Sequence, residues 1–195
     1  TGAFTPTGSM HFGRAFVSIV HLTDGRILVH GAAFEELQPP EIYDPTTGTF
    51  ALLDGPPDFQ WPTTATGLED GRILLTGDCC DEDFVALPTA AILDVTTADL
   101  QTISPMNEGR FGHEAVALLD GRILLTGGGA VGGHGWSPSQ SAEIYDPATA
   151  TFTLIDQMSD GRHWHTTTLL PDGTVLVVGD RGDPTTYSAE LFAPR

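Results

Sequence analysis

The chain has no lysine and only two cysteines among its 195 residues. The cysteines are adjacent, at Cys79 and Cys80, so they cannot link distant parts of the chain, and either a vicinal disulfide or two thiols remains open. No hydrophobic run approaches the roughly 20 residues that a membrane-spanning helix needs. The first residues also show no signal peptide. We therefore expect no membrane insertion.

Basic residues are scarce. Eight arginines stand against 26 acidic residues, which gives a formal net charge of −18. A field of this sign repels phosphate backbones and argues against nucleic acid as a partner. The acidity is typical of a well-solvated surface, and we expect an extracellular or cell-surface location.

Common catalytic motifs are missing as well. The glycine-rich run 127–135 lacks the Lys-Ser/Thr ending and the following helix of a phosphate loop. No serine or cysteine nucleophile motif occurs, and no pair of carboxylates has a spacing that suggests acid–base chemistry. The sequence thus predicts that the chain is not an enzyme.

Repetition is what the chain has in abundance. Asp-Gly followed by an apolar run recurs at Asp24, Asp70, Asp120 and Asp172, at intervals of 46, 50 and 52 residues. Counting from Asp172 through the last residue and on from Thr1 to Asp24 gives 47, which is one more repeat. Periods of 20 to 50 residues indicate solenoids, propellers or arrays.

The two ends of the chain complete one another. Ala189–Arg195 followed by Thr1–Met10 aligns without a gap on Ala142–Met158. The sequence therefore predicts an all-β fold, a four-bladed β-propeller closed by pairing of the N-terminal strand with the C-terminal strands. Closure within one chain, as a monomer, and strand exchange between two chains, as a dimer forming a larger ring, both remain open.

Each blade should contain four antiparallel strands. In the third copy these are residues 112–119, a two-residue Asp-Gly hairpin turn, then 122–127, 142–146 and 151–155. We expect a single domain over residues 1–195, with blade 1 at about 11–53, blade 2 at about 60–103, blade 3 at about 110–155, and blade 4 at about 162–195 plus 1–7.

The long loops should gather on one face, because an up-and-down sheet alternates its connections between two ends. The other face carries tight turns only. Aromatic residues on variable loops of a rigid scaffold are typical of ligand binding. The candidate ligand-binding residues of this long-loop face are Phe34, Phe59, Trp61, Phe84, Phe111, Trp136, His163 and Tyr187.

Three stretches of the third copy resemble the kelch repeat. They are Gly109-Arg110-Phe111-Gly112-His113, the run Leu118–Gly129, and Ala142-Glu143-Ile144-Tyr145-Asp146-Pro147. The resemblance extends over the whole chain and is closest to the bacterial type that is similar to the galactose oxidase propeller domain. It implies a propeller fold.

Galactose oxidase-like enzymes hold copper with tyrosines and histidines, one tyrosine being cross-linked to a cysteine. In this sequence Tyr43 and Tyr145 take a third-strand position suited to packing, and Tyr187 lies in a loop. Cys79 and Cys80 replace a Gly-Gly pair of the second blade. The pattern does not reproduce the copper site, and we expect no cofactor.

Two repeat positions place polar residues at the predicted channel mouth. One holds Arg14, Gln60, Arg110 and Arg162, which suit either a bound carboxylate or salt bridges between blades to the chain's own acidic residues. The other holds His113 and His165, which suit either a divalent metal ion or structural hydrogen bonds. We favour the structural interpretation of both.

The least repetitive segment is acidic. Asp78, Cys79, Cys80, Asp81 and Asp83 are weak candidates for a metal site, with oxygen ligands for Ca²⁺ or thiolates for a softer metal. The spacing is not that of a calcium-binding loop, and a solvated acidic loop is the preferred interpretation.

These observations favour a non-catalytic binding or assembly module that takes a protein or glycan at the long-loop face. One alternative is a small metal-dependent enzyme with a divalent metal ion at His113 and His165. Another is a structural bead of a longer extracellular repeat protein.

Overall fold

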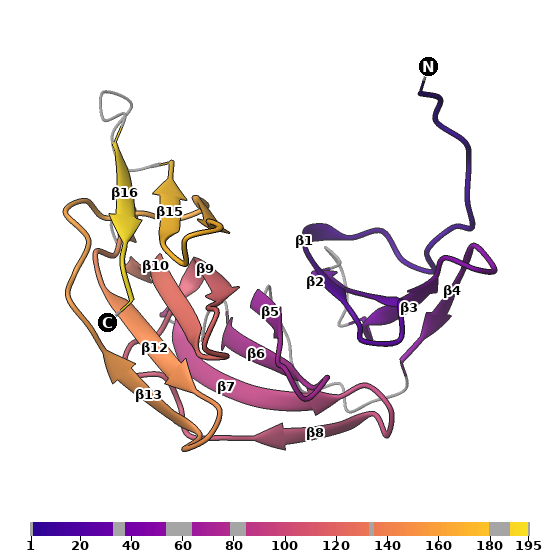
Figure 1. Cartoon of the computed structure of the whole chain (residues 1–195), viewed down its shortest axis with the longest axis horizontal. Helices are drawn as coiled ribbons and strands as arrows, with labels where there is room; N and C mark the ends of the chain where they lie inside the picture. The colour runs from indigo at the N-terminus through magenta and orange to yellow at the C-terminus, as the bar shows by residue number, and fades with distance from the viewer. Residues whose placement is uncertain are drawn as a thin grey trace.

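The structure, a computed structural model, describes residues 2–32, 38–53, 64–78, 85–132, 135–179 and 188–194. Within these ranges the chain is all β, and its strands form four antiparallel sheets, one for each blade (Figure 1). The prediction of an all-β four-bladed propeller is confirmed. The described residues form no helix, and hence none that is long and apolar enough to cross a membrane.

Strands pair in chain order within each blade, as in a meander. Blade 1 contains β1 (Ala15–His21), β2 (Ile27–Ala32), β3 (Glu41–Asp44) and β4 (Thr49–Leu52). Blade 2 contains β5 (Thr64–Gly67), β6 (Ile73–Asp78), β7 (Leu87–Asp94) and β8 (Asp99–Thr102). Blade 3 contains β9 (Phe111–Ala117), β10 (Ile123–Gly132), β12 (Ala142–Asp146) and β13 (Thr151–Leu154), with the short β11 (Gly135–Pro138) paired to the far end of β10. Blade 4 contains β14 (Thr166–Leu169), β15 (Val175–Val178) and β16 (Ala189–Phe192).

The hairpins between the first two strands differ in detail from the predicted two-residue turn. Leu22 N donates to Arg26 O at 2.9 Å and Gly25 N donates to Leu22 O at 3.0 Å, so three residues form the loop. Gly25 takes a left-handed φ of 87°, whereas Asp24 is not among the described residues with positive φ. The Asp24 carboxylate instead accepts hydrogen bonds from the backbone N and the Nε of Arg26, at 3.0 and 2.8 Å. A type I turn closed by a left-handed glycine results.

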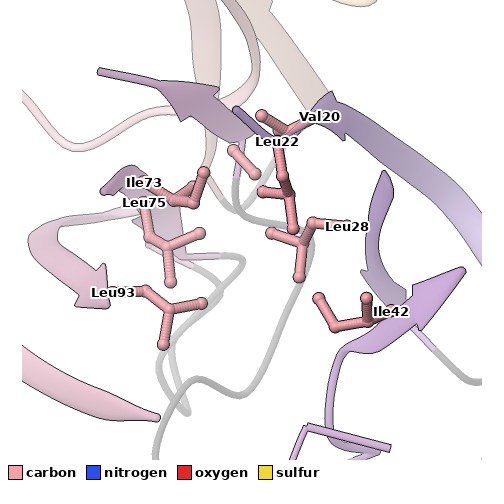
Figure 2. Packing of buried hydrophobic residues seen from close by; sticks show 8 residues of the cluster. Val20, Leu22, Leu28, Ile42, Ile73, Leu75 and Leu93 are labelled. Atoms are coloured by element: carbon pink, nitrogen blue, oxygen red, sulfur yellow. The ribbon is translucent and has the colours of Figure 1, made fainter. Parts of the chain in front are cut away.

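The hydrophobic core lies between blades. In the cluster drawn in Figure 2, Val20, Leu22, Leu28 and Ile42 of blade 1 face Ile73, Leu75 and Leu93 of blade 2. The same repeat positions form a second cluster between blades 2 and 3 and a third between blades 3 and 4. The first strands of successive blades lie next to one another, so they form the inner edge of the assembly and the fourth strands form its outer edge (Figure 1).

The predicted closure of the ring is wrong in this structure. Blade 4 has three strands, and residues 2–8 do not pair with β16. Gly8 N donates instead to Gly48 O of blade 1 at 2.8 Å, and Phe4 is fully exposed. The physical reason is that the four blades fan out in an arc with blades 1 and 4 at its two ends, so the N-terminal segment lies far from β16 (Figure 1).

Candidate functional site

Blades 1, 3 and 4 each contain an arginine–glutamate pair, which is fully buried in blades 1 and 3 and partly exposed at the glutamate in blade 4. In each, an arginine from the link that enters the blade meets a glutamate on the third strand of the same blade. The Nη2–Oε1 distances are 3.0 Å for Arg14–Glu41, 2.9 Å for Arg110–Glu143 and 2.9 Å for Arg162–Glu190. Each guanidinium also donates through Nη1 to the carbonyl of a glycine that lies in the second strand or directly follows it, namely Gly31, Gly127 and Gly179.

The arginine position has two interpretations, binding of a carboxylate ligand and salt bridges to the chain's own acidic residues. These contacts favour the salt bridges. The guanidinium groups bind the chain's own glutamates, although within a blade and not between blades as expected. In blade 2 the sequence replaces both partners, with Gln60, outside the described residues, and Ala91. The paired replacement fits a structural role.

Hydrogen bonds set the charge of the glutamates. Burial raises the pKa of Glu41, but hydrogen bonds from the backbone and ring of His11 and from Arg14 outweigh it, and the pKa lies below its ordinary value. The pKa of Glu190 is lowered in the same way, because bonds from Ser159 and Arg162 outweigh burial. Both carboxyls are therefore ionised at neutral pH.

His113 and His165 link neighbouring blades. The Nε2 of His113 lies 2.9 Å from Thr76 Oγ1 of blade 2, and the Nε2 of His165 lies 2.8 Å from Thr126 Oγ1 of blade 3. Burial, helped by the nearby Arg110 and Arg162, lowers their pKa values to about 3 and about 4. Both imidazoles are neutral at pH 7, and the described part of the chain holds no cluster of three metal-ligating side chains.

The aromatic candidates of the long-loop face are largely beyond the described ranges. Of those that are described, His163 is buried, and Phe111 is buried against Trp164 in an edge-on contact with 5.0 Å between ring centroids. Trp136 belongs to β11. Phe34, Phe59, Trp61, Phe84 and Tyr187 lie outside the described residues. A protein or glycan partner at this face stays a prediction.

The acidic-loop metal candidates are also mostly outside the described residues. Asp78 ends β6, while Cys79, Cys80, Asp81 and Asp83 fall in the gap that follows it. The two described tyrosines lie in the packing of the blades. Tyr43 and Tyr145 stack on Phe50 and Phe152 of the outer strands, with ring centroids 4.7 and 4.8 Å apart.

Glu114 is a titratable residue that the sequence analysis missed. It lies on β9 opposite Thr126, so both side chains face blade 4. Burial raises the pKa of Glu114 to about 7, and the described residues supply no ion-pair partner. The other blades carry hydroxyl residues at this position, Ser18, Thr64 and Thr166, so aligning the repeats would have revealed the exception.

The surroundings of this position are the inner edge of the propeller. Thr64, the counterpart in blade 2, donates through Oγ1 to the His113 carbonyl of the next blade at 3.1 Å. Ser18, the counterpart in blade 1, accepts from Ala65 N of the next blade at 3.4 Å. Glu114 therefore places a carboxyl beside the inner strand of blade 4, where the other blades place hydroxyls. Such a group can exchange a proton near neutral pH.

Comparisons with known proteins support the fold. No protein-family model matches the sequence, and no curated protein matches it. Among solved structures the chain is similar to a fungal alcohol oxidase, described as novel and catalytically diverse within the AA5 family, in complex with copper. The TM-score is 0.56 at 20% identity, over 90% of this chain and 50% of that chain. The chain thus spans about half the length of the fungal protein and shares its galactose oxidase-like β-propeller fold.

This likeness corrects three expectations. The sequence analysis predicts a non-catalytic binding or assembly module, no enzymatic activity and no cofactor. The similar structure is described as an alcohol oxidase in complex with copper, and this finding counts against all three expectations. The same finding counts against the structural-bead alternative. His113 and His165 each bond a threonine through Nε2, and a metal ion at this pair stays a prediction.

Proposed function

We propose that this chain is the propeller portion of an enzyme that acts on alcohols, with Glu114 as its acid–base group. The observation that carries the proposal is the raised pKa of Glu114, about 7, at the inner edge of the propeller. Oxidation of an alcohol to a carbonyl removes the hydroxyl proton and a hydride equivalent from the carbon. A base takes the proton and works best when its pKa is near the working pH, and an external two-electron oxidant, dioxygen for an oxidase, takes the hydride equivalent. The fold shared with an alcohol oxidase supports the choice of substrate class.

The environment of Glu114 supports a chemical role over a structural one. The buried glutamates on the third strands of blades 1 and 3, Glu41 and Glu143, are each paired with an arginine. Glu114 differs, since among the described residues nothing compensates its charge and burial alone governs its pKa. Uncompensated burial of a carboxyl costs stability, and such groups gather at functional sites.

No chemical step is assigned to copper. Among the described residues, Tyr43 and Tyr145 pack against phenylalanines, His113 and His165 bond threonines, and no group of three His, Cys, Asp or Glu side chains could hold a metal ion. The part assigned to this chain is to orient the alcohol at the inner edge and to accept its hydroxyl proton at the Glu114 carboxylate.

The proposal is tested by turnover of simple primary alcohols, followed as carbonyl product over pH 5 to 9, with and without added copper. We expect Glu114→Gln to lower kcat by about 10²-fold or more and to remove the rise in rate around pH 7. Glu69→Gln, at an exposed glutamate of the blade 2 turn, is the matched control and should keep both. Unchanged kcat and pH profile in Glu114→Gln would contradict the proposal.

We also propose that the four blades are kelch-type repeats and that the protein acts outside the cell. Support for the first comes from the arginine–glutamate pair that recurs in three blades together with the Asp-Gly turn that recurs in all four. Support for the second comes from the acidic, lysine-free composition.

A further inference from the structure

The two end blades present the halves of a fourth junction between blades. At the three existing junctions the second-strand leucines Leu28, Leu74 and Leu124 are fully buried, whereas their counterpart Leu176 of blade 4 is partly exposed. On the opposite side of each junction Ile73, Ile123 and Val175 are fully buried, whereas their counterpart Ile27 of blade 1 is partly exposed. Each end of the arc therefore has the side chains of a junction without the facing blade.

Larger apolar side chains are exposed at the same two ends. On blade 4, Leu191 is 64% exposed, although the isoleucines at its repeat position in the other blades are buried. On blade 1, Ile19 is 62% exposed, although Ala65 at the same position of blade 2 is buried. Exposed apolar groups at positions that are otherwise buried indicate that another surface covers them.

Two repeat positions near the inner strands hold different residues at the existing junctions and at the open ends. The difference supports direct contact between the two open ends. The same two repeat positions meet at two junctions, Thr76 with His113 and Thr126 with His165. At the remaining junction the sequence has His30 and Thr63 at these positions, and Thr63 lies outside the described residues. At the open ends the two positions hold Val178 and Val17, each 41% exposed. The two positions that are polar at the existing junctions are thus both apolar at the open ends. This paired change is what we expect if the two valines contact each other.

Blade 4 also lacks its outer strand, and a cavity lies beside β16. The cavity has a volume of about 600 Å³, and its lining includes Ile155, Leu191 and Phe192. In blade 3 the corresponding space beside Tyr145 is filled by Phe152 of the outer strand, with 4.8 Å between the ring centroids. The repeat alignment puts Phe4 in the position of Phe152.

The turn that would lead into this strand matches as well. Outer strands are entered through a residue with left-handed φ, which is Gly48 at 69°, Ala98 at 59° and Ala150 at 54°. The repeat alignment places Gly2 at that position, and glycine adopts such a φ without cost. Residues 1–7 therefore have both the turn and the aromatic residue of an outer strand.

We propose that two copies of this chain associate head to tail into an eight-bladed ring. Residues 1–7 of each copy form the outer strand of blade 4 in the other copy, Phe4 fills the cavity beside Phe192, and Val17 packs on Val178 across each of two equivalent junctions. A two-fold axis through the ring relates the copies, so every open end is closed.

The arrangement of the blades favours a second copy over the chain's own N-terminal segment. His11 N is held by Glu41 Oε2 of blade 1 at 2.9 Å, which anchors the segment at the opposite end of the arc from β16 (Figure 1). The arc also matches about half of a longer chain, with a TM-score of 0.56. The assembly does not depend on the proposed activity.

Mass in solution is the first test, by native mass spectrometry and light scattering of the 195-residue chain. We expect twice the chain mass of 20.7 kDa. Phe4→Ala should shift the mass to 20.7 kDa, and Leu154→Ala, at an exposed outer-strand leucine away from both ends, should leave the dimer intact. A wild-type chain that stays at 20.7 kDa at 50 μM overturns the proposal.

Cross-linking identifies the occupant of the junction. Val17→Cys and Val178→Cys are made separately in a Cys79→Ser/Cys80→Ser background, and both positions are exposed in one copy, so neither change should impair folding. Mixing the two variants under oxidation should give a disulfide-linked dimer on a non-reducing gel. Absence of this dimer overturns the proposal, as does a double variant that cross-links only within one chain, because the chain would then close its own ring.

Discussion

The arginine and glutamate that pair in blades 1, 3 and 4 are both replaced in blade 2, so the chain itself allows a comparison of the paired and the replaced residues. Arg110 and Glu143 are buried together, and blade 2 has lost both partners at once. Removal of one partner from a buried ion pair leaves a charge without compensation and costs about 3–5 kcal/mol, whereas replacement of both partners is often tolerated. The chain itself therefore contains the tolerated replacement.

We expect Arg110→Gln to lower the free energy of unfolding by about 3 kcal/mol or more, because the Glu143 carboxylate stays buried. Addition of Glu143→Ala, which gives blade 3 the residues of blade 2, should recover most of that loss. Urea unfolding followed by tryptophan fluorescence measures both. Effects of the two changes that simply add would show that the pair is not coupled.

Glu114 leads to a prediction of the opposite sign. Its pKa in the folded chain, about 7, lies above the ordinary value of 4.5, so the folded state keeps a proton that the unfolded state releases. The contribution of Glu114 to stability therefore falls as pH rises from 4.5 to 7 and stays low above that range.

Glu114→Gln should accordingly stabilise the chain by about 2 kcal/mol at pH 8 and have little effect at pH 4.5, as measured by urea unfolding at both pH values. Combined with the loss of turnover, a gain in stability marks a residue kept for chemistry. Loss of stability at pH 8 would instead assign Glu114 a structural role.

At the level of strands, one histidine–threonine bond joins β9 to β6, and a second joins His165, the residue before β14, to β10. The pKa values of His113 and His165 in the folded chain, about 3 and about 4, lie below the ordinary 6.5. The stability that these neutral side chains contribute is thus complete above pH 6.5. It is lost as pH falls toward 4 for His165 and toward 3 for His113, because the unfolded state takes up protons first.

We expect the change from pH 7 to pH 5 to destabilise the wild-type chain, with about 2 kcal/mol from each histidine. His113→Gln should reduce this pH dependence by its share, and His21→Gln, at an exposed histidine, should not. Urea midpoints at the two pH values give the comparison. An unchanged pH dependence of stability in His113→Gln would mean that protonation of His113 does not contribute to the loss of stability at pH 5.

The hairpin turns show which structural features the local sequence predicts and which it does not. The repeated Asp-Gly pair correctly places the hairpins, but the turn type depends on the carboxylate of Asp24, which bonds the backbone of Arg26 and keeps a negative φ. Pairing of strands within a blade follows from the repeat alone. Which residues face the next blade follows from the alternation of side chains along each strand.

For the whole molecule, the repeat predicts four blades, and the structure confirms them. The repeat also predicts that residues 1–7 supply the outer strand of a fourth blade, but it carries no information on which copy's blade they pair with. That outcome depends on the rotation between blades, which is set by the packing of clusters such as Leu28 with Ile73. The acid–base candidate Glu114 was missed for a related reason, since its raised pKa comes from burial beside a neighbouring blade.

The arginine–glutamate pairs have a consequence for how such a chain can grow. The partners are separated by 27 residues in blade 1, 33 in blade 3 and 28 in blade 4, which is always less than one repeat. A tandem gene duplication of a single repeat would therefore copy both partners together and would leave no orphaned charge behind. Propellers with different blade numbers can descend from one another in this way without compensating changes elsewhere.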